Sequence, residues 1–174
     1  MKLKQKKLRA NLNSKHVFPR ERKESWKSRT KRWKINLFPA FQGTGGKVIY
    51  IHPDLNEIHL KLPLNRKTIN PNGTIFGGSM YGTVEWIPPV MITLLLGPEY
   101  IAWNKESRIY FIRPGTDTLY ARFKMSNEEL IRIRTKFIGE EKVDRQYKIS
   151  LIDKYKNVCA IVNLSIQIKA KYDG

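Results

Sequence analysis

Glu85 is the most conspicuous candidate for chemistry, because it is the only charged side chain between residues 68 and 98. At the average charged content of the chain, 28%, a stretch of that length would hold about nine. Glu85 follows a glycine-rich turn that ends in Phe-Gly-Gly at residues 76–78, within an apolar segment that we expect to be helical. Burial disfavours the charged form of a carboxyl group, so a buried glutamate normally has a partner or a chemical role. We interpret Glu85 as a functional residue; an inert ion pair with an arginine such as Arg113 is the alternative.

The spacing of Asn70, the glycine pair and Glu85 resembles the motif of the hotdog-fold acyl-CoA thioesterases. In the phenylacetate-pathway thioesterases the motif is Asn, five residues, His-Gly-Gly, six residues and Asp, and the same counting here runs from Asn70 through residues 76–78 to Glu85. The chain looks closest to a branch in which Gly-Thr-x-Phe-Gly-Gly replaces the histidine form and a strand with Trp103 runs into a Pro-Gly turn. The resemblance covers about residues 25 to 170. It departs from the motif at Phe76, in place of histidine, and at Glu85, in place of aspartate.

The resemblance implies hydrolysis of an acyl-CoA thioester. The apolar side chains along the expected helix, such as Met80, Trp86 and Met91, favour a medium-chain or long-chain acyl group. Glu85 would act as a general base on water or as the nucleophile, and Asn70 would orient the water or the carbonyl group. The backbone N–H of Gly78, at the start of a helix, would polarise the thioester carbonyl. The expected substrate-binding residues are Phe76, Gly77, Ser79, Tyr81 and Arg113. No metal or redox cofactor is expected, and coenzyme A enters only as part of the substrate.

The distance between the two catalytic groups predicts an oligomer. Gly78 and Glu85 are seven positions apart, which is about 10 Å along a helix axis. One reacting carbon cannot lie within hydrogen-bonding reach of both groups, so a second chain must supply one of them. The resembling family places them across a dimer interface, and we expect a homodimer or a dimer of dimers. The alternative is a non-catalytic acyl-CoA-binding protein in which the glycines only allow close packing and Asn70 only shapes a turn.

The remaining pattern predicts an α+β hotdog fold, an antiparallel sheet wrapped around one long central helix. Period-two alternation and turn residues predict strands at 47–51, 57–62, 100–112, 118–124, 145–154 and 158–169. The first two should form a hairpin, and so should the third and fourth. The expected helices are the central one from 77 to about 87, a short buried one at 90–96 after two prolines, and one capped by Ser126 that runs to about 137.

Positive charge is concentrated near the N-terminus. Residues 1–34 hold fourteen Lys or Arg against two Glu, a net charge of +12 out of +18 for the chain. We expect a basic, disordered arm over residues 1–24, followed by the hotdog domain at 25–174. That domain should begin with a docking helix over about residues 23–37, with Trp26, Trp33 and Leu37 brought together and the basic side chains outside. An alternative function is therefore binding of an anionic membrane or a nucleic acid through residues 1–34.

Several function classes lack the residues they need. Cys159 is the only cysteine, which excludes an intramolecular disulfide and a cysteine-based metal cluster and favours a buried strand thiol. The three histidines are scattered without zinc-site spacing. The most apolar run, residues 90–96, is far shorter than the roughly 20 residues of a membrane span, and no apolar segment follows the basic start as in a secretory signal peptide. We expect a cytoplasmic protein.

Overall fold

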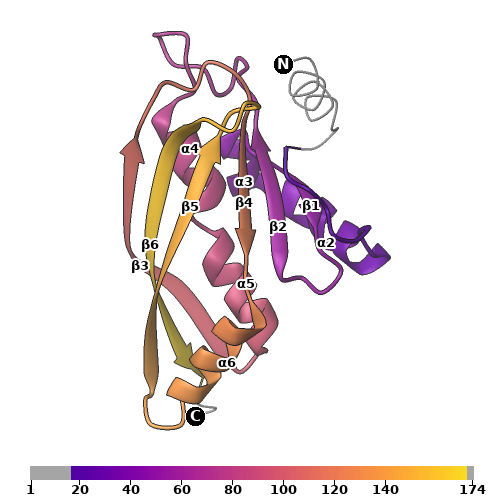
Figure 1. Ribbon diagram of the computed structural model, residues 1–174, viewed down its shortest axis with the longest axis vertical. Helices are drawn as coiled ribbons and strands as arrows, with labels where there is room; N and C mark the ends of the chain where they lie inside the picture. Colours follow the sequence, from indigo (N-terminus) through magenta and orange to yellow (C-terminus); the bar gives the residue numbers. More distant parts are fainter. Residues whose placement is uncertain (1–16, 172–174) are drawn as a thin grey trace, which may run out of the picture.

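Six antiparallel strands form one sheet in the order β1-β2-β4-β5-β6-β3, which wraps around two consecutive helices, α4 and α5 (Figure 1). The computed structural model describes residues 17–171. The strands are β1 (Lys47–Ile51), β2 (Glu57–Leu62), β3 (Tyr100–Phe111), β4 (Leu119–Lys124), β5 (Lys142–Ile152) and β6 (Val158–Ala170). The helices are α2 (Trp26–Leu37), α3 (Pro39–Thr44), α4 (Gly77–Val84), α5 (Ile87–Leu96) and α6 (Asn127–Lys136). This is the predicted α+β hotdog fold.

The inner face of the sheet and the α4–α5 pair share one hydrophobic core. Alternate residues of β6 point inward and are buried, as the period of two in a strand requires. The core residues contributed by β6, α4 and α5 include Val162, Leu164, Ile166, Met80, Val84, Met91 and Ile92. Burial of apolar surface, at about 25 cal/mol per Å², thus holds the central helices against the sheet.

The central helix is interrupted at Glu85 and Trp86, because α4 ends at Val84 and α5 begins at Ile87. The sequence predicted a helix to about residue 87 that the two prolines end or kink. The interruption comes earlier because Pro88 and Pro89 have no N–H to donate to the carbonyl groups four residues before them, those of Val84 and Glu85. Both prolines instead lie in the first turn of α5, where the missing N–H groups cost nothing.

Strand β3 pairs with β6 at one edge of the sheet, whereas the sequence predicted a hairpin with β4. That prediction was wrong because strand length outweighs closeness in sequence. The twelve residues of β3 match the thirteen of β6, but β4 has only six, so the pairing with β6 satisfies more backbone groups. The ladder contains a β-bulge between Asn104 and Glu106. Along its other edge, β3 has no partner strand among residues 17–171.

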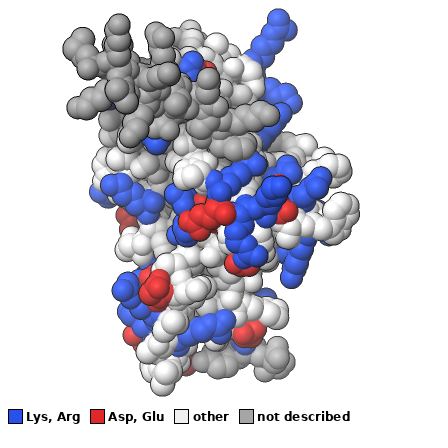
Figure 2. Space-filling model, turned by 45° about the vertical axis from the view of Figure 1, so that its right-hand side comes forward, with Lys and Arg blue, Asp and Glu red and all other residues white. Residues whose placement is uncertain are grey.

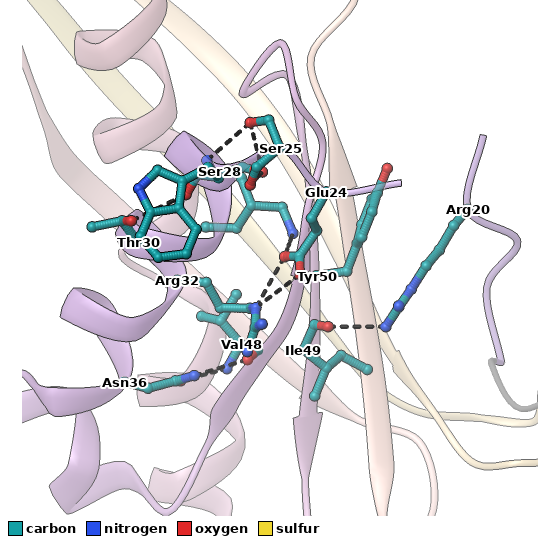
Figure 3. Close-up of polar contacts among 12 residues, drawn as sticks. Arg20, Glu24, Ser25, Ser28, Thr30, Arg32, Asn36, Val48, Ile49 and Tyr50 are labelled. Carbon is teal, nitrogen blue, oxygen red and sulfur yellow. Dashed lines mark hydrogen bonds and ion pairs between the residues drawn. The ribbon is translucent and has the colours of Figure 1, made fainter. Parts of the chain in front are cut away.

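Polar side chains hold α2 against β1. The amide group of Asn36 accepts a bond from the Val48 N–H (2.8 Å) and donates to the Val48 carbonyl (2.9 Å). The Glu24 carboxylate accepts from the Ile51 N–H and from Arg32, both at 2.9 Å (Figure 3). Since β1 is an edge strand, these side chains satisfy backbone groups that no neighbouring strand reaches.

The aromatic side chains of α2 therefore face solvent. Trp26, Trp33 and Leu37 lie close together on one side of the helix, as predicted, but their exposed fractions are 80%, 64% and 67%. The predicted helix is present, and the predicted docking face is wrong. The side of the helix opposite the stripe carries the buried Ser28 and Ile35, which packs against the core, so the apolar stripe is turned away from the domain.

Residues 17–24 differ from the prediction of a free arm up to residue 24. Arg20 donates to the Ile49 carbonyl at 2.9 Å, and the Phe18 ring lies 5.3 Å from the ring of His59. Glu21 accepts from Lys124 at 2.6 Å. This part of the chain therefore packs on the outer face of β1, β2 and β4. The rest of the predicted arm, residues 1–16, lies outside the described residues.

Candidate active site

Helix α4 begins with three backbone N–H groups that have no acceptor among the described residues, those of Gly77, Gly78 and Ser79. The first bonded amide is that of Met80, which donates to the Phe76 carbonyl at 3.2 Å. Free N–H groups at a helix start, at the positive end of the helix dipole, suit an oxygen that gains negative charge. The structure therefore provides the kind of donor that the sequence predicted at Gly78.

Aromatic rings pack directly on the glycines at this helix start. A Cβ at Gly78 would lie 2.4 Å from the Phe76 ring, and one at Gly77 would lie 2.8 Å from the ring of Phe111. Phe76, which stands where the motif has histidine, is 57% exposed and precedes the helix as its N-cap residue. Its ring thus lies over the Gly78 backbone at the surface rather than in the core.

Asn70 shapes the loop before α4. Its side-chain oxygen accepts from the N–H groups of Asn72 (3.0 Å) and Thr74 (3.1 Å), and its amide nitrogen donates to the Thr74 hydroxyl (2.9 Å). Asn70, Gly77 and Arg113 line a common pocket of about 400 Å³ at the start of α4. The side chain of Asn70 is occupied within its own loop, which is the turn-forming role that the sequence left open as an alternative.

Glu85 lies at the interruption between α4 and α5, where Asn104 of β3 holds it. The Asn104 amide nitrogen donates to the Glu85 carboxylate and, at 2.9 Å, to the Glu85 carbonyl, the group that Pro89 cannot bond. Every second residue of β3 faces inward up to Asn104, and the β-bulge that follows shifts this alternation. Asn104 is therefore the last inward-facing residue before the bulge. No Lys or Arg forms an ion pair with Glu85 among the described residues, so the inert pair with Arg113 is absent.

The surroundings of Glu85 are apolar. Glu85 lines a pocket of about 450 Å³ between the N-terminal helices and the α4–α5 pair. The apolar walls of this pocket are formed by Ile35, Phe38, Phe41, Trp86 and Val90. Burial raises the pKa of the Glu85 carboxyl group above its ordinary value, and the bond from Asn104 opposes that rise only in part. A half-buried carboxylate with a raised pKa beside an apolar cavity is typical of general bases.

Within one chain, the predicted catalytic groups belong to two different pockets. Gly77, beside Gly78, lines the pocket at the helix start, whereas Glu85 lines the pocket at the other end of α4. Ser79 is buried and Tyr81 is half-buried against the core, and neither lines either pocket. The separation agrees with the argument that one chain cannot bring Gly78 and Glu85 to one reacting carbon.

Two parts of this site were not predicted from the sequence. One is Asn104, whose side-chain oxygen is buried without a hydrogen-bond partner among the described residues. The other is the pocket wall contributed by α2 and α3, where Phe41 packs edge-on against Trp86 with ring centroids 5.1 Å apart. The signal for Asn104 was weak, because its neighbours Ile101 and Trp103 suggest the opposite inward face for β3.

Comparison with known proteins places residues 27–168 in a described family, DUF4442, a domain of unknown function. The chain belongs to the DUF4442 family. The sequence matches no curated protein. Among solved structures, this DUF4442 chain is similar to a Pseudomonas aeruginosa protein of unknown function described as a probable thioesterase, with 18% identity and a TM-score of 0.74 over 82% of this chain and 95% of that one. It is also similar to a thioesterase from Haemophilus influenzae, with 13% identity and a TM-score of 0.63 over 87% of this chain and 98% of that one.

These structural likenesses show the hotdog fold, and the DUF4442 match covers most of the domain that carries both pockets. Among residues 17–171, no cluster of His, Cys, Asp or Glu side chains is arranged to hold a metal ion. None of the helices described here has the length and apolar character needed to cross a bilayer.

Proposed function

We propose that this protein is an acyl-CoA thioesterase that works as a homodimer, in which Glu85 of one chain acts on a thioester held at the α4 start of the other. The observation that carries the proposal is the position of Glu85, which is half-buried and lines an apolar pocket of about 450 Å³. Its burial there raises the pKa of the carboxyl group, in keeping with the role of a base. A cavity of that size and character suits an acyl chain. The thioesterase descriptions of structural neighbours from Pseudomonas aeruginosa and Haemophilus influenzae support the choice of reaction.

In the proposed reaction, the free N–H groups at the start of α4 donate to the thioester oxygen as it gains negative charge. The Glu85 carboxylate removes a proton from water, which attacks the carbonyl carbon; the C–S bond then breaks and the thiolate of coenzyme A leaves with a proton. Direct attack by Glu85 to form an anhydride, which water then opens, uses the same residues. Arg113, at the pocket beside the helix start, is the proposed contact for a phosphate group of coenzyme A.

The partner chain would bring the two half-sites together. The edge of β3 has no partner strand within residues 17–171, and Asn104 of that strand holds Glu85. Pairing of β3 with its copy would satisfy the exposed backbone groups of this edge. The same contact would place the carboxylate of one chain near the α4 start of the other, which the spacing along α4 requires.

We expect hydrolysis of acyl-CoA to depend on chain length. Each methylene group that enters the apolar pocket contributes about 0.8 kcal/mol, so kcat/KM should rise about fourfold per added carbon until the pocket is full. Release of free thiol from a series of saturated acyl-CoA substrates, from acetyl to palmitoyl, measures this. Absence of turnover across the series, with folded and dimeric protein, would contradict hydrolysis. Acyl-CoA binding under those conditions would identify the non-catalytic alternative.

We expect replacement of Asn104 by alanine to move the acidic limb of the pH–kcat/KM profile to higher pH. The reason is that Asn104 lowers the pKa of Glu85, which burial alone would raise further. A general base must be ionised, so activity falls as pH drops through its pKa in the folded protein. The matched control is Asn163→Ala on the exposed side of β6, which should leave the limb in place. If the acidic limb of the pH–kcat/KM profile lies at the same pH in the Asn104→Ala variant as in wild type, the assignment of Glu85 as the titrating base is contradicted.

A further inference from the structure

The outward side of α2 combines apolar side chains with exposed cations. Trp26, Trp33 and Leu37 are exposed along one stripe, and the exposed Phe38 follows the last turn. Trp26, Arg29, Thr30, Trp33, Lys34 and Leu37 line a shallow groove of about 350 Å³. Large apolar side chains exposed side by side on an otherwise polar helix, rather than singly, are typical of a binding surface.

The charge on this side is of one sign. Helix α2 carries no acidic residue, and among its five cations only Arg32 has an acidic partner in the described chain, Glu24. Lys27, Arg29 and Lys34 are exposed beside the tryptophans, and the Arg29 guanidinium lies 5.9 Å from the Trp26 ring. Figure 2, which turns the α2 side of the molecule forward, shows Lys and Arg outnumbering acidic side chains over this face.

We propose that the outward side of α2, together with Phe38, docks on a membrane surface that contains anionic phospholipids. Tryptophan rings and basic side chains on one face of a helix are the combination that binds the boundary between lipid headgroups and acyl chains. Leu37 and Phe38 favour lipid over nucleic acid, because a phosphate backbone offers nothing apolar to cover them. The polar bonds from Asn36 and Glu24 to β1 hold α2 on the domain while the stripe stays exposed, so docking requires no unfolding.

The same docking would bring the Glu85 pocket to the lipid surface. Lys34 lines both the groove of α2 and that pocket, and Ile35 and Phe38 form part of the pocket wall. Long-chain acyl-CoA partitions into membranes, so its acyl chain would be at hand where the pocket opens. This last step rests on the proposed thioesterase function, whereas the docking itself does not.

The test is sedimentation of the full chain with vesicles of phosphatidylcholine alone or mixed with phosphatidylglycerol. We expect binding to the mixed vesicles only, and a fall of about tenfold when salt screens the cations. The double variant Trp26→Ser/Trp33→Ser should lose about tenfold or more in partitioning. The matched control is Tyr155→Ser/Ile138→Ser, which removes apolar side chains that are 63% and 86% exposed elsewhere on the domain and should bind as the wild type does.

Three results would overturn the docking proposal. The first is equal binding by wild type and the tryptophan variant, and the second is an equal loss in the control variant. The third is no vesicle binding, accompanied by loss of a dimer or of RNA binding in the tryptophan variant alone, which would assign the stripe to a second copy or to nucleic acid. Vesicle binding is measured without any turnover of substrate, so the Glu85→Gln protein should bind vesicles as the wild type does. The docking proposal can therefore be tested even if the protein proves not to be a thioesterase.

Discussion

Replacement of Glu85 by glutamine is expected to lower kcat for acyl-CoA hydrolysis by about 10²- to 10⁴-fold, the usual contribution of a positioned general base. Glutamine keeps the shape of the side chain and an oxygen that can accept the bond from Asn104. What it lacks is the ability to take a proton from water. Binding of a non-hydrolysable acyl-CoA analogue should therefore stay within about twofold of wild type, since the pocket walls are unchanged.

The same substitution should not destabilise the fold. A carboxyl group whose pKa is raised in the folded protein adds stability below its pKa in the unfolded chain, and this contribution is lost as pH rises through the folded pKa. Ionisation of the half-buried Glu85 therefore costs stability, and glutamine cannot ionise, so the melting temperature of the variant should be equal or higher. The control is Glu106→Gln, an exposed acid on β3, which should retain activity. Equal losses in both variants, or undiminished turnover after Glu85→Gln, would show that Glu85 is not the base.

A co-expression experiment tests whether the site is shared between chains. Gly78→Val should block the helix start, where a Cβ already meets the Phe76 ring at 2.4 Å. This variant is co-expressed with Glu85→Gln, and each of the two variants expressed alone should be inactive. In a dimer that contains one chain of each, one site carries both lesions and the other carries none, so random pairing should restore about a quarter of wild-type activity. No recovery in dimers shown to be mixed would mean that both groups act within one chain.

Removal of the Arg122 side chain beyond its stem, by Arg122→Met, is expected to lower the free energy of unfolding by about 3 kcal/mol at neutral pH. The Glu57 carboxylate is only 1% exposed, and Arg122 donates to both of its oxygens, at 2.8 and 3.1 Å. His59, which is also buried, contacts Glu57 at 2.6 Å. Without Arg122, a buried carboxylate would lose its main partner, and Lys124 at 3.6 Å could replace it only in part.

The dependence of the free energy of unfolding on pH distinguishes loss of the ion pair from loss of packing. Burial by itself raises the pKa of Glu57, but the bonds from Arg122 and His59 outweigh it and hold the pKa below its ordinary value. Such a group contributes stability above its pKa in the unfolded chain, and this is lost as pH falls through the folded pKa. Urea unfolding of wild type should show that loss in acid. In the Arg122→Met variant the effect of burial on the Glu57 pKa is no longer outweighed, so the pKa should rise above its ordinary value. Lowering the pH then protonates the buried carboxylate, and the free energy of unfolding should increase.

The matched control for this experiment is Arg108→Met on β3. Arg108 and its acidic partner Glu106 are 67% and 71% exposed, with 3.9 Å between the charged atoms. An exposed pair of this kind contributes at most about 1 kcal/mol. A comparable effect of the two substitutions would show that Glu57 is better solvated than its burial indicates. An effect of Arg122→Met that does not change with pH would assign the loss to packing of the arginine stem.

Local patterns in the sequence were sufficient for much of the architecture. The alternation at residues 47–51 and 57–62 predicted β1 and β2 with their observed bounds. Ser126 caps α6 as predicted, accepting from the Glu129 N–H at 3.2 Å, because a capping signal acts within one turn of the chain. Cys159 is a buried strand residue, as its apolar neighbours indicated. The isolation of Glu85 in an uncharged stretch indicated an apolar environment, and Glu85 is half-buried beside an apolar pocket.

Contacts between distant segments decided the rest. The choice of β6 over β4 as the partner of β3 depended on matching strand lengths, and the bond between Asn104 and Glu85 depended on that choice. The side of α2 that contacts the domain was set by the unsatisfied edge of β1, which attracts Asn36 and Glu24 and turns the tryptophans to solvent. A sequence pattern records which residues lie on one face of an element. Whether that face is buried depends on which backbone groups and surfaces elsewhere still need a partner, and only the tertiary structure supplies those.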